Sequence, residues 1–226
     1  MDFSIPKNID TIFVDCFDTI VFRNTNKNEV FKNWAKDLST KYNIPWKVIY
    51  KKYKRINFKM CFKKLITTLT LQENFEVVLD NLYSRIIKKY PNIKKEDFIN
   101  SAQEVYFQKE LDCFHLNKNM IKFLNQQKSE GKKIYLVSDF YCKSEMITKW
   151  LSKLKILDVF TQVFSSSDFN KEKATTKIYK HLISLLKVNP SNTIMFGDNL
   201  WSDVMMARRC KLNAKRVKKF RRKDEK

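Results

Sequence analysis

Three short apolar segments of this 226-residue chain end in side chains that can do polar chemistry. Asp15 ends the first segment, Ser138 and Asp139 end the second, and Asp198 ends the third. In an open parallel sheet, ligands bind outside the carboxyl ends of the strands, because side chains from different strands converge there. The pattern therefore predicts a cluster of carboxylates and a hydroxyl drawn from segments far apart in the sequence.

A further carboxylate, Asp203, follows Asp198 by five residues, through a loop that leads into a predicted helix. Such a loop can bring both carboxylates back to one point. Carboxylates held that close repel each other and raise one another's pKa unless a cation lies between them. The chain has only two histidines and no CxxC pair, so the donors are hard oxygens, and the cation that they favour is Mg²⁺.

Strands and helices that alternate along the chain must position these groups. We predict strands at residues 11–15, 133–137, 162–165, 193–196 and 214–217, and helices at 117–130, 144–154, 174–187 and 202–210. Strands that alternate with helices of about 10 to 15 residues indicate a parallel sheet with helices on both faces. The expected fold class is α/β with a doubly wound parallel sheet.

A long helical stretch separates the first strand from the others. Apolar residues recur at spacings of three and four from about residue 28 to 111, and Pro45 and Pro91 divide the stretch into about four helices. We therefore expect residues 1–21 and 115–226 to form the α/β core, and residues 22–114 to form a helical insertion.

The composition excludes several other kinds of site. The two glycines, Gly131 and Gly197, are too few and too far apart for a glycine-rich phosphate loop or a dinucleotide-binding fingerprint. Five scattered cysteines argue against a disulfide framework or a cysteine-zinc site. The N-terminal residues lack a signal-peptide core, and no uncharged apolar run approaches the roughly 20 residues of a membrane helix. We expect a cytoplasmic protein without a membrane span.

Four short motifs stand in the order that is typical of the haloacid dehalogenase-like (HAD) superfamily of hydrolases, which the chain resembles along essentially its whole length. They are Asp15-Cys16-Phe17-Asp18-Thr19, Ser138 after an apolar strand, Lys173, and the pair Asp198 and Asp203. Within that superfamily, the string from Val14 to Thr19 is most similar to a subgroup associated with capsular polysaccharide synthesis, except that Val14 replaces a phenylalanine. The resemblance implies a Rossmann-like core, with residues 22–114 as a type-one cap.

The resemblance implies a nucleophile and a metal site. Asp15 would attack phosphorus and form an aspartyl-phosphate, which splits the hydrolysis into two easier steps. Asp15, Asp198 and the backbone carbonyl of Phe17 would hold Mg²⁺ between carboxylate and phosphate. The substrate would be a small phosphorylated compound, such as a phosphorylated sugar, a sugar nucleotide or an attached small alcohol.

The resemblance also implies groups that bind the phosphoryl oxygens and stabilise their charge. Ser138 and Lys173 would do so, with Lys171 or Lys177 as alternatives to Lys173. Thr19 stands at the usual position of the nucleophile's partner, and Asp203 would orient Lys173 or a metal-bound water. Asp139 is interpreted as a structural loop residue.

Phe17 departs from the pattern of that superfamily, in which most phosphatases carry a second aspartate two residues after the nucleophile. That aspartate is the general acid and base for the leaving alcohol, a contribution of roughly 10²- to 10⁴-fold in rate, and phenylalanine cannot transfer a proton. Three alternatives would replace the missing general acid: proton transfer by Asp18, a substrate whose leaving group departs easily, or a proton donor from the cap. The departure also leaves open a second function, a catalytically impaired HAD-fold protein that binds phosphate or nucleotide, or regulates.

The chain is strongly basic, with 45 Lys and Arg against 24 Asp and Glu and a formal net charge of +21. We favour solvated lysine faces as the reason. Steering of an anionic substrate is one alternative, and contact of the basic tail at residues 215–223 with an acidic surface or nucleic acid is another, although nucleic acid is not the partner we expect. Carbon–halogen cleavage is disfavoured because two carboxylates in the fourth motif indicate a metal. The oligomeric state stays open.

Overall fold

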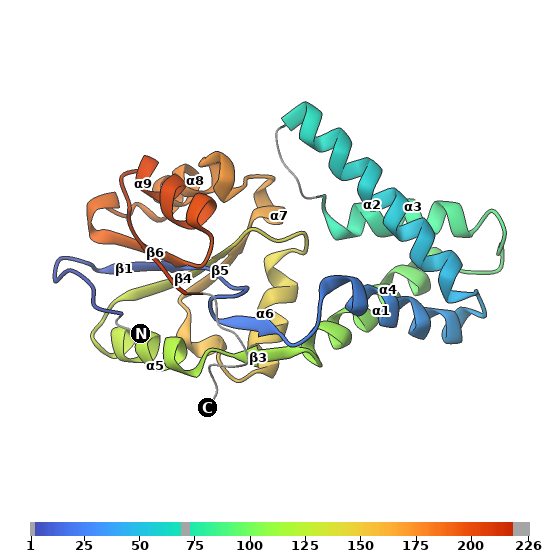
Figure 1. The fold of residues 1–226 in the computed structure, drawn as a ribbon, viewed down its shortest axis with the longest axis horizontal. Coiled ribbons are helices and arrows are strands. Elements are labelled where there is room, and N and C mark those ends of the chain that lie inside the picture. Colours follow the sequence, from blue (N-terminus) through green and yellow to red (C-terminus); the bar gives the residue numbers. More distant parts are fainter. Residues whose placement is uncertain (1–2, 69–72, 219–226) are drawn as a thin grey trace. The chain divides into compact units, whose positions relative to one another are not determined.

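The computed structural model describes residues 3–68 and 73–218, which fall into two compact units (Figure 1). The first unit comprises the described parts of Met1–Phe22 and His115–Lys226, and the second comprises those of Arg23–Phe114. The part of the predicted basic tail from residue 219 onward lies outside the described residues.

The first unit is built on a parallel five-stranded sheet with the strand order β5-β4-β1-β6-β7. Its strands are β1 (Thr11–Val14), β4 (Lys133–Ser138), β5 (Gln162–Ser165), β6 (Thr193–Gly197) and β7 (Asn213–Arg216). The central strand β1 pairs with β4 on one side and with β6 on the other, so that Val14 is level with Leu136 and with Phe196. The carboxyl ends of β1, β4 and β6 are therefore adjacent.

Alternate side chains along the strands form a core on each face of the sheet. On one face, Phe13, Tyr135 and Met195 are buried with the apolar sides of α8 (Lys177–Leu186) and α9 (Met206–Arg209). On the other face, the ring centroid of Phe196 lies 5.5 Å from that of Phe123 on α5 (Lys118–Ser129). Figure 1 shows α5 and α6 (Ser144–Lys153) on one side of the sheet, and α8 and α9 on the other. The predicted α/β fold with a doubly wound parallel sheet is confirmed.

The described part of the second unit is helical and contains α1 (Lys27–Tyr42), α2 (Trp46–Thr68), α3 (Phe75–Ile86) and α4 (Lys95–Leu111). Its interior is rich in aromatic side chains. The Phe31 ring stacks on Tyr53 and on Tyr106, with centroids 4.3 and 5.2 Å apart, and the buried Trp34 indole N–H donates to the Ala102 carbonyl. Among the described helices of both units, none combines the length and the hydropathy that crossing a membrane requires.

Three local features differ from the predicted elements. Strands β2 (Val21–Arg23) and β3 (Phe114–Leu116) form a two-stranded sheet, and both are too short to show an alternating pattern. The helix predicted from residue 174 starts with a 3₁₀ turn, Lys173–Thr175, and continues as α8 only after Thr176, which has a left-handed backbone (φ 63°). The helix predicted from residue 202 is a π-helical turn, Leu200–Met205, followed by the four residues of α9.

Candidate active site

Asp15 comes directly after β1 and is held at the edge of the sheet. Its backbone N–H continues the strand pairing by donating to the Phe196 carbonyl of β6 at 2.8 Å. The chain then turns, with two backbone N–H groups of the returning segment donating to the Cys16 carbonyl. Asp18 occupies a left-handed position in this turn (φ 59°), which aspartate adopts more readily than most residues. The turn buries the side chains of both Asp15 and Thr19.

The ammonium group of Lys173 lies between two buried carboxylates. Its Nζ donates to Oδ1 of Asp15 and to Oδ1 of Asp203, at 2.5 Å in each case, and the residue is only 2% exposed. The Coulomb attraction at this distance favours the charged lysine strongly, so its pKa stays well above the usual range although burial opposes this. Lys173 is thus the lysine in contact with the carboxylate that follows β1.

The backbone of Lys173 is fixed by Asp139, which follows β4. Both carboxylate oxygens of Asp139 accept the Lys173 N–H, at 2.9 and 3.0 Å, and burial raises the pKa of this carboxyl. Close by in the sequence, the Tyr179 hydroxyl donates to the Ser202 carbonyl at 2.8 Å, and burial raises its pKa well above 10. The sequence marks Asp139 only by its place at a strand end. In the sequence, nothing distinguishes Tyr179 from the apolar residues of its helix.

The loop after β6 brings Asp203 back toward the end of the strand. Asn199 starts the loop, and its side-chain carbonyl accepts the backbone N–H groups of Trp201 and Ser202. The backbone N–H of Asn199 donates to Asp203 Oδ2 at 3.0 Å. Gly197 permits this packing, because a Cβ at that position would lie 2.3 Å from Cγ of Asp203. The π-helical turn that carries Asp203 is a conformation found frequently at functional sites.

The carboxylates of Asp15, Asp198 and Asp203 form a site that fits a divalent cation. One oxygen from each lies within 4.8 Å of the others. Burial raises the pKa of Asp15 to about 8; the Lys173 ammonium opposes the rise, and the charges of Asp203 and Asp198 add to it. When ionised, the three carboxylates and the one ammonium sum to −2, which a divalent cation would neutralise, and oxygen donors are those that Mg²⁺ prefers.

Two buried hydroxyl groups of the same unit have no hydrogen-bond partner among the described atoms. They are Oγ of Ser138, the last residue of β4, and Oγ1 of Thr19, four residues after Asp15. Buried polar side chains are paired in the great majority of cases. These two atoms are therefore available to a bound ligand.

The Phe17 side chain belongs to an aromatic cluster. Its ring centroid lies 4.4 Å from that of Phe140 and 6.5 Å from that of Trp150, on the loop after β4 and on α6. Asp18 is not one of the acidic residues whose oxygens gather within 4.8 Å of one another in the described structure. Among the residues predicted for the site, Asp15, Lys173, Asp198 and Asp203 are brought together.

Comparison with known proteins identifies the family. Residues 9–211 match the family model of the haloacid dehalogenase-like hydrolases. The chain belongs to this family. The superfamily predicted from the four motifs is thereby confirmed, and so is the prediction that the protein is an enzyme.

Relatives of this HAD-like hydrolase are remote in sequence. The glyceraldehyde 3-phosphate phosphatase of Pyrococcus furiosus is 24% identical over 206 residues, which are 89% of this chain and 78% of the relative. A 2-haloacid dehalogenase from Pseudomonas syringae pv. Tomato has a TM-score of 0.62 at 13% identity, covering 91% of this chain and 85% of that one. The HAD-hydrolase YfnB of Bacillus subtilis, bound to magnesium, has a TM-score of 0.57 at 16% identity, covering 92% and 86%. The two structures show a shared fold.

Proposed function

We propose that this HAD-like hydrolase is a Mg²⁺-dependent phosphatase that acts on a phosphomonoester through an aspartyl-phosphate on Asp15. The observation that carries this proposal is the burial of Lys173 Nζ between the carboxylates of Asp15 and Asp203, at 2.5 Å from each. A nucleophilic carboxylate beside fixed positive charge is what phosphoryl transfer needs, because the transition state spreads negative charge over the phosphoryl oxygens. The phosphatase activity in the name of the Pyrococcus furiosus relative supports the choice of reaction.

In the proposed site, Asp15, Asp198 and the backbone carbonyl of Phe17 would hold Mg²⁺. When bound, Mg²⁺ supplies positive charge between the attacking carboxylate and the phosphoryl oxygens. The pKa of about 8 for Asp15 without a cation supports this, since a protonated carboxyl is a poor nucleophile. Asp203 keeps the Lys173 ammonium in place through the bond at 2.5 Å.

The reaction proceeds in two displacement steps at phosphorus. An oxygen of Asp15 bonds to phosphorus, the bond to the leaving oxygen breaks, and the electron pair departs with that oxygen. Because Lys173 already bonds Oδ1, we assign the attack to Oδ2. Water then bonds to phosphorus as the bond to Asp15 breaks, which releases inorganic phosphate and regenerates the carboxylate. The hydroxyls of Ser138 and Thr19, unpaired among the described atoms, donate to the phosphoryl oxygens, and Lys173 stabilises their charge.

For the leaving group, Asp18 is the proposed proton donor. Phe17 cannot serve, and its ring is held against Phe140 with centroids 4.4 Å apart. Asp18 follows Phe17 directly, in the turn after Asp15, and is the acidic residue nearest to Phe17 on its C-terminal side.

The substrate that we propose is a phosphorylated sugar, a sugar nucleotide or an attached small alcohol. The resemblance of the segment from Val14 to Thr19 to the capsular polysaccharide subgroup supports this substrate class. We also propose a cytoplasmic location, which the five scattered cysteines support. The helical residues 22–114 are proposed to act as the cap that selects the substrate, and residues 1–21 and 115–226 as the catalytic core.

A phosphate-release assay tests this function. The purified protein is offered a panel of phosphorylated sugars, sugar nucleotides, polyol phosphates and glyceraldehyde 3-phosphate, with Mg²⁺ or with EDTA. We expect release from at least one compound with Mg²⁺ only, and none from Asp15→Asn, while Asp10→Asn, an exposed aspartate before β1, retains the activity. Release by Asp15→Asn equal to that of the wild type would overturn the assignment.

A second candidate function is favoured by the packing of Phe17. With a phenyl ring in the aromatic cluster, the site is also suited to bind phosphate without turning it over. In that case calorimetry would detect binding of inorganic phosphate or nucleotide with Mg²⁺, the affinity would be insensitive to Asp15→Asn, and no compound in the panel would release phosphate.

A further inference from the structure

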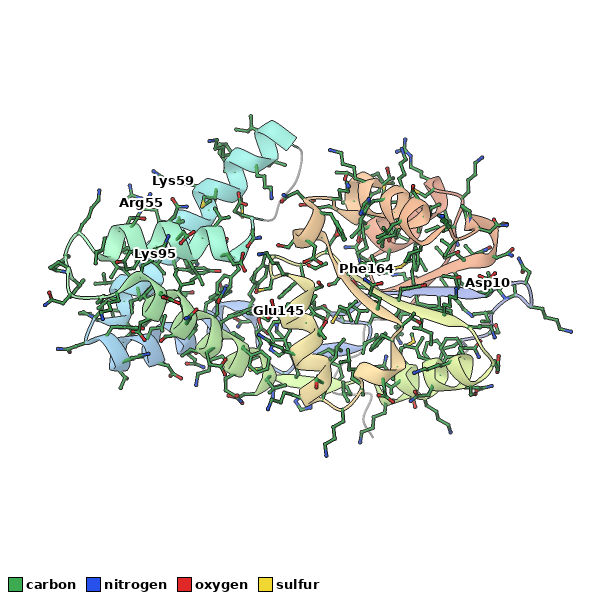
Figure 2. The ribbon with its side chains drawn as sticks, turned by 180° about the vertical axis from the view of Figure 1, so that it is seen from behind. Asp10, Arg55, Lys59, Lys95, Glu145 and Phe164 are labelled. Atoms are coloured by element: carbon green, nitrogen blue, oxygen red, sulfur yellow. The ribbon has the colours of Figure 1, made fainter. Side chains whose placement is uncertain are left out.

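Helix α2 carries an unusual concentration of positive charge. Its 23 residues, Trp46–Thr68, contain no aspartate or glutamate and eight basic residues. Most of the basic side chains are exposed; these are Lys47, Lys51, Lys54, Arg55, Lys59 and Lys63. Figure 2 labels Arg55 and Lys59, which lie about one turn apart on this helix. Helix α2 thus contributes +8 to the formal net charge of +21.

The same helix exposes large apolar side chains. Phe58, Phe62 and Ile66 are 71%, 56% and 66% exposed, and they follow one another at the four-residue spacing that places side chains on one side of a helix. The rings of Phe58 and Phe62 are stacked, with centroids 6.2 Å apart. Leu65 adds to this ridge. Exposed apolar groups gathered in this way mark an interaction site more often than scattered ones do.

The apolar ridge is not the side of α2 that packs inside the helical unit. That inner side consists of Ile49, Tyr53 and Ile56, which are buried. Phe62 comes nine residues after Tyr53, about two and a half helical turns, so the two side chains point in opposite directions. The ridge is therefore not needed for the core of its own unit.

We propose that this outer face of α2 binds the surface of an anionic lipid bilayer. The face is defined by Phe58, Phe62, Leu65 and Ile66, with Lys51, Arg55, Lys59 and Lys63 beside them. A surface that combines exposed Phe, Leu and Ile side chains with flanking lysines and no acidic residue of the helix suits an anionic membrane interface. Its apolar side chains enter the boundary between headgroups and acyl chains, and its cations lie at the level of the lipid phosphates.

A lipid surface suits this face better than other anionic partners do. Nucleic acids are bound by aromatic rings that stack on bases, and the aliphatic Leu65 and Ile66 have no such role. An acidic protein would need a groove shaped to receive a protruding ridge of apolar side chains, whereas a fluid bilayer adapts to it. The +21 net charge of the whole chain adds long-range attraction toward an anionic surface.

Cosedimentation of the full-length protein with lipid vesicles tests the proposal. We expect binding to vesicles of equal parts phosphatidylglycerol and phosphatidylcholine, little binding to phosphatidylcholine alone, and release as NaCl is raised toward 1 M. The double variant Phe58→Gln with Phe62→Gln should weaken binding by about tenfold or more. The triple variant Lys51→Gln, Arg55→Gln and Lys59→Gln should weaken it by about fivefold per charge removed, or about 100-fold in all.

Matched variants elsewhere on the surface provide the controls. Val77→Gln with Leu185→Gln removes two other exposed apolar side chains, and Lys177→Gln, Lys180→Gln and Arg209→Gln remove two lysines and an arginine from exposed sites in the first unit. These should change vesicle binding by less than about twofold, since only the α2 face enters the interface. Circular dichroism shows that each variant is folded.

Several results would overturn the proposal. They are equal binding to neutral and anionic vesicles, a loss in the control variants as large as in the α2 variants, or no vesicle binding at all. Retention of poly(U) or polyglutamate in preference to vesicles would assign the face to nucleic acid or to an acidic protein instead. None of these depends on phosphatase activity, so the membrane proposal and the catalytic one are tested separately.

Discussion

Replacing Lys173 with methionine tests the charge balance of the site, because it removes the ammonium and keeps a side chain of similar length. In the wild type the ammonium lies 2.5 Å from Asp15 and from Asp203, and both side chains are buried. The substitution removes the positive charge that these two acidic side chains share. Removing one partner of a buried ion pair costs about 3–5 kcal/mol. The protein can limit this cost by taking up one proton more than the wild type does.

The free-energy cost of that extra proton determines how much stability the variant loses and how this loss depends on pH. Protonating a carboxyl whose ordinary pKa is about 3.9 costs about 4 kcal/mol at pH 7 and about 1.5 kcal/mol at pH 5. A carboxyl whose pKa is raised in the folded state contributes stability at low pH and loses it as the pH rises. In EDTA, Lys173→Met should therefore lower the free energy of unfolding by about 4 kcal/mol at pH 7 and by about 1.5 kcal/mol at pH 5.

Urea unfolding followed by circular dichroism measures this difference, with Lys177→Met as the control. Lys177 is exposed at the start of α8, and its substitution should change the free energy of unfolding by no more than about 0.5 kcal/mol at either pH. Adding Mg²⁺ should restore part of the stability of Lys173→Met, because the cation neutralises the same oxygens. It should not restore phosphate release. A loss that is equal at pH 5 and pH 7, and unchanged by Mg²⁺, would refute the reasoning.

Three other substitutions separate stability from catalysis. Ser138→Ala should leave the free energy of unfolding within about 0.5 kcal/mol of the wild type, because no described hydrogen bond is lost, yet lower kcat by about 10²- to 10³-fold; a stability loss of several kcal/mol in urea unfolding would contradict this. Gly197→Ala should destabilise by about 1–3 kcal/mol and reduce phosphate release, because the new Cβ would meet the Asp203 carboxylate at 2.3 Å; an unchanged melting temperature and rate would show that the loop does not need glycine. Tyr179→Phe loses the hydrogen bond to the Ser202 carbonyl and should cost about 1 kcal/mol in thermal unfolding, with a smaller effect on kcat than Ser138→Ala; the reverse order of the two kcat values would give Tyr179 a larger part in catalysis.

The strands β1, β4 and β6 could be predicted from the sequence because each contains a continuous apolar run, whereas β7, Asn-Ala-Lys-Arg, contains none. The strand predicted at residues 162–165 matches β5, and those predicted at 133–137 and 193–196 are each one residue shorter than β4 and β6. Such runs are typical of parallel strands that are buried on both faces. The short strands β2 and β3 carry no such signal, since three residues are too few to show a period.

Only those residues of the candidate site that lie at strand ends or at the spacing of a motif could be predicted from the sequence. These include Asp15, Lys173, Asp198 and Asp203, which the structure brings together. The support that Asp139 gives to the Lys173 backbone depends on loop conformation, which sequence spacing does not describe. The π-helical turn at Leu200–Met205 was hidden because its residues fit an ordinary helix equally well. The packing of Phe17 on Phe140 joins residues more than a hundred positions apart.

Trapping the covalent intermediate tests the central claim most directly. The protein is mixed with Mg²⁺ and the best substrate of the panel, quenched in acid within one turnover, digested, and its peptides are analysed by mass spectrometry. We predict a phosphoryl group on the peptide that contains Asp15, located on that residue by fragmentation, lost on treatment with hydroxylamine and absent from Asp15→Asn. Phosphate release that proceeds at the normal rate with no phosphoryl group on Asp15, or with one on a different residue, would contradict the account.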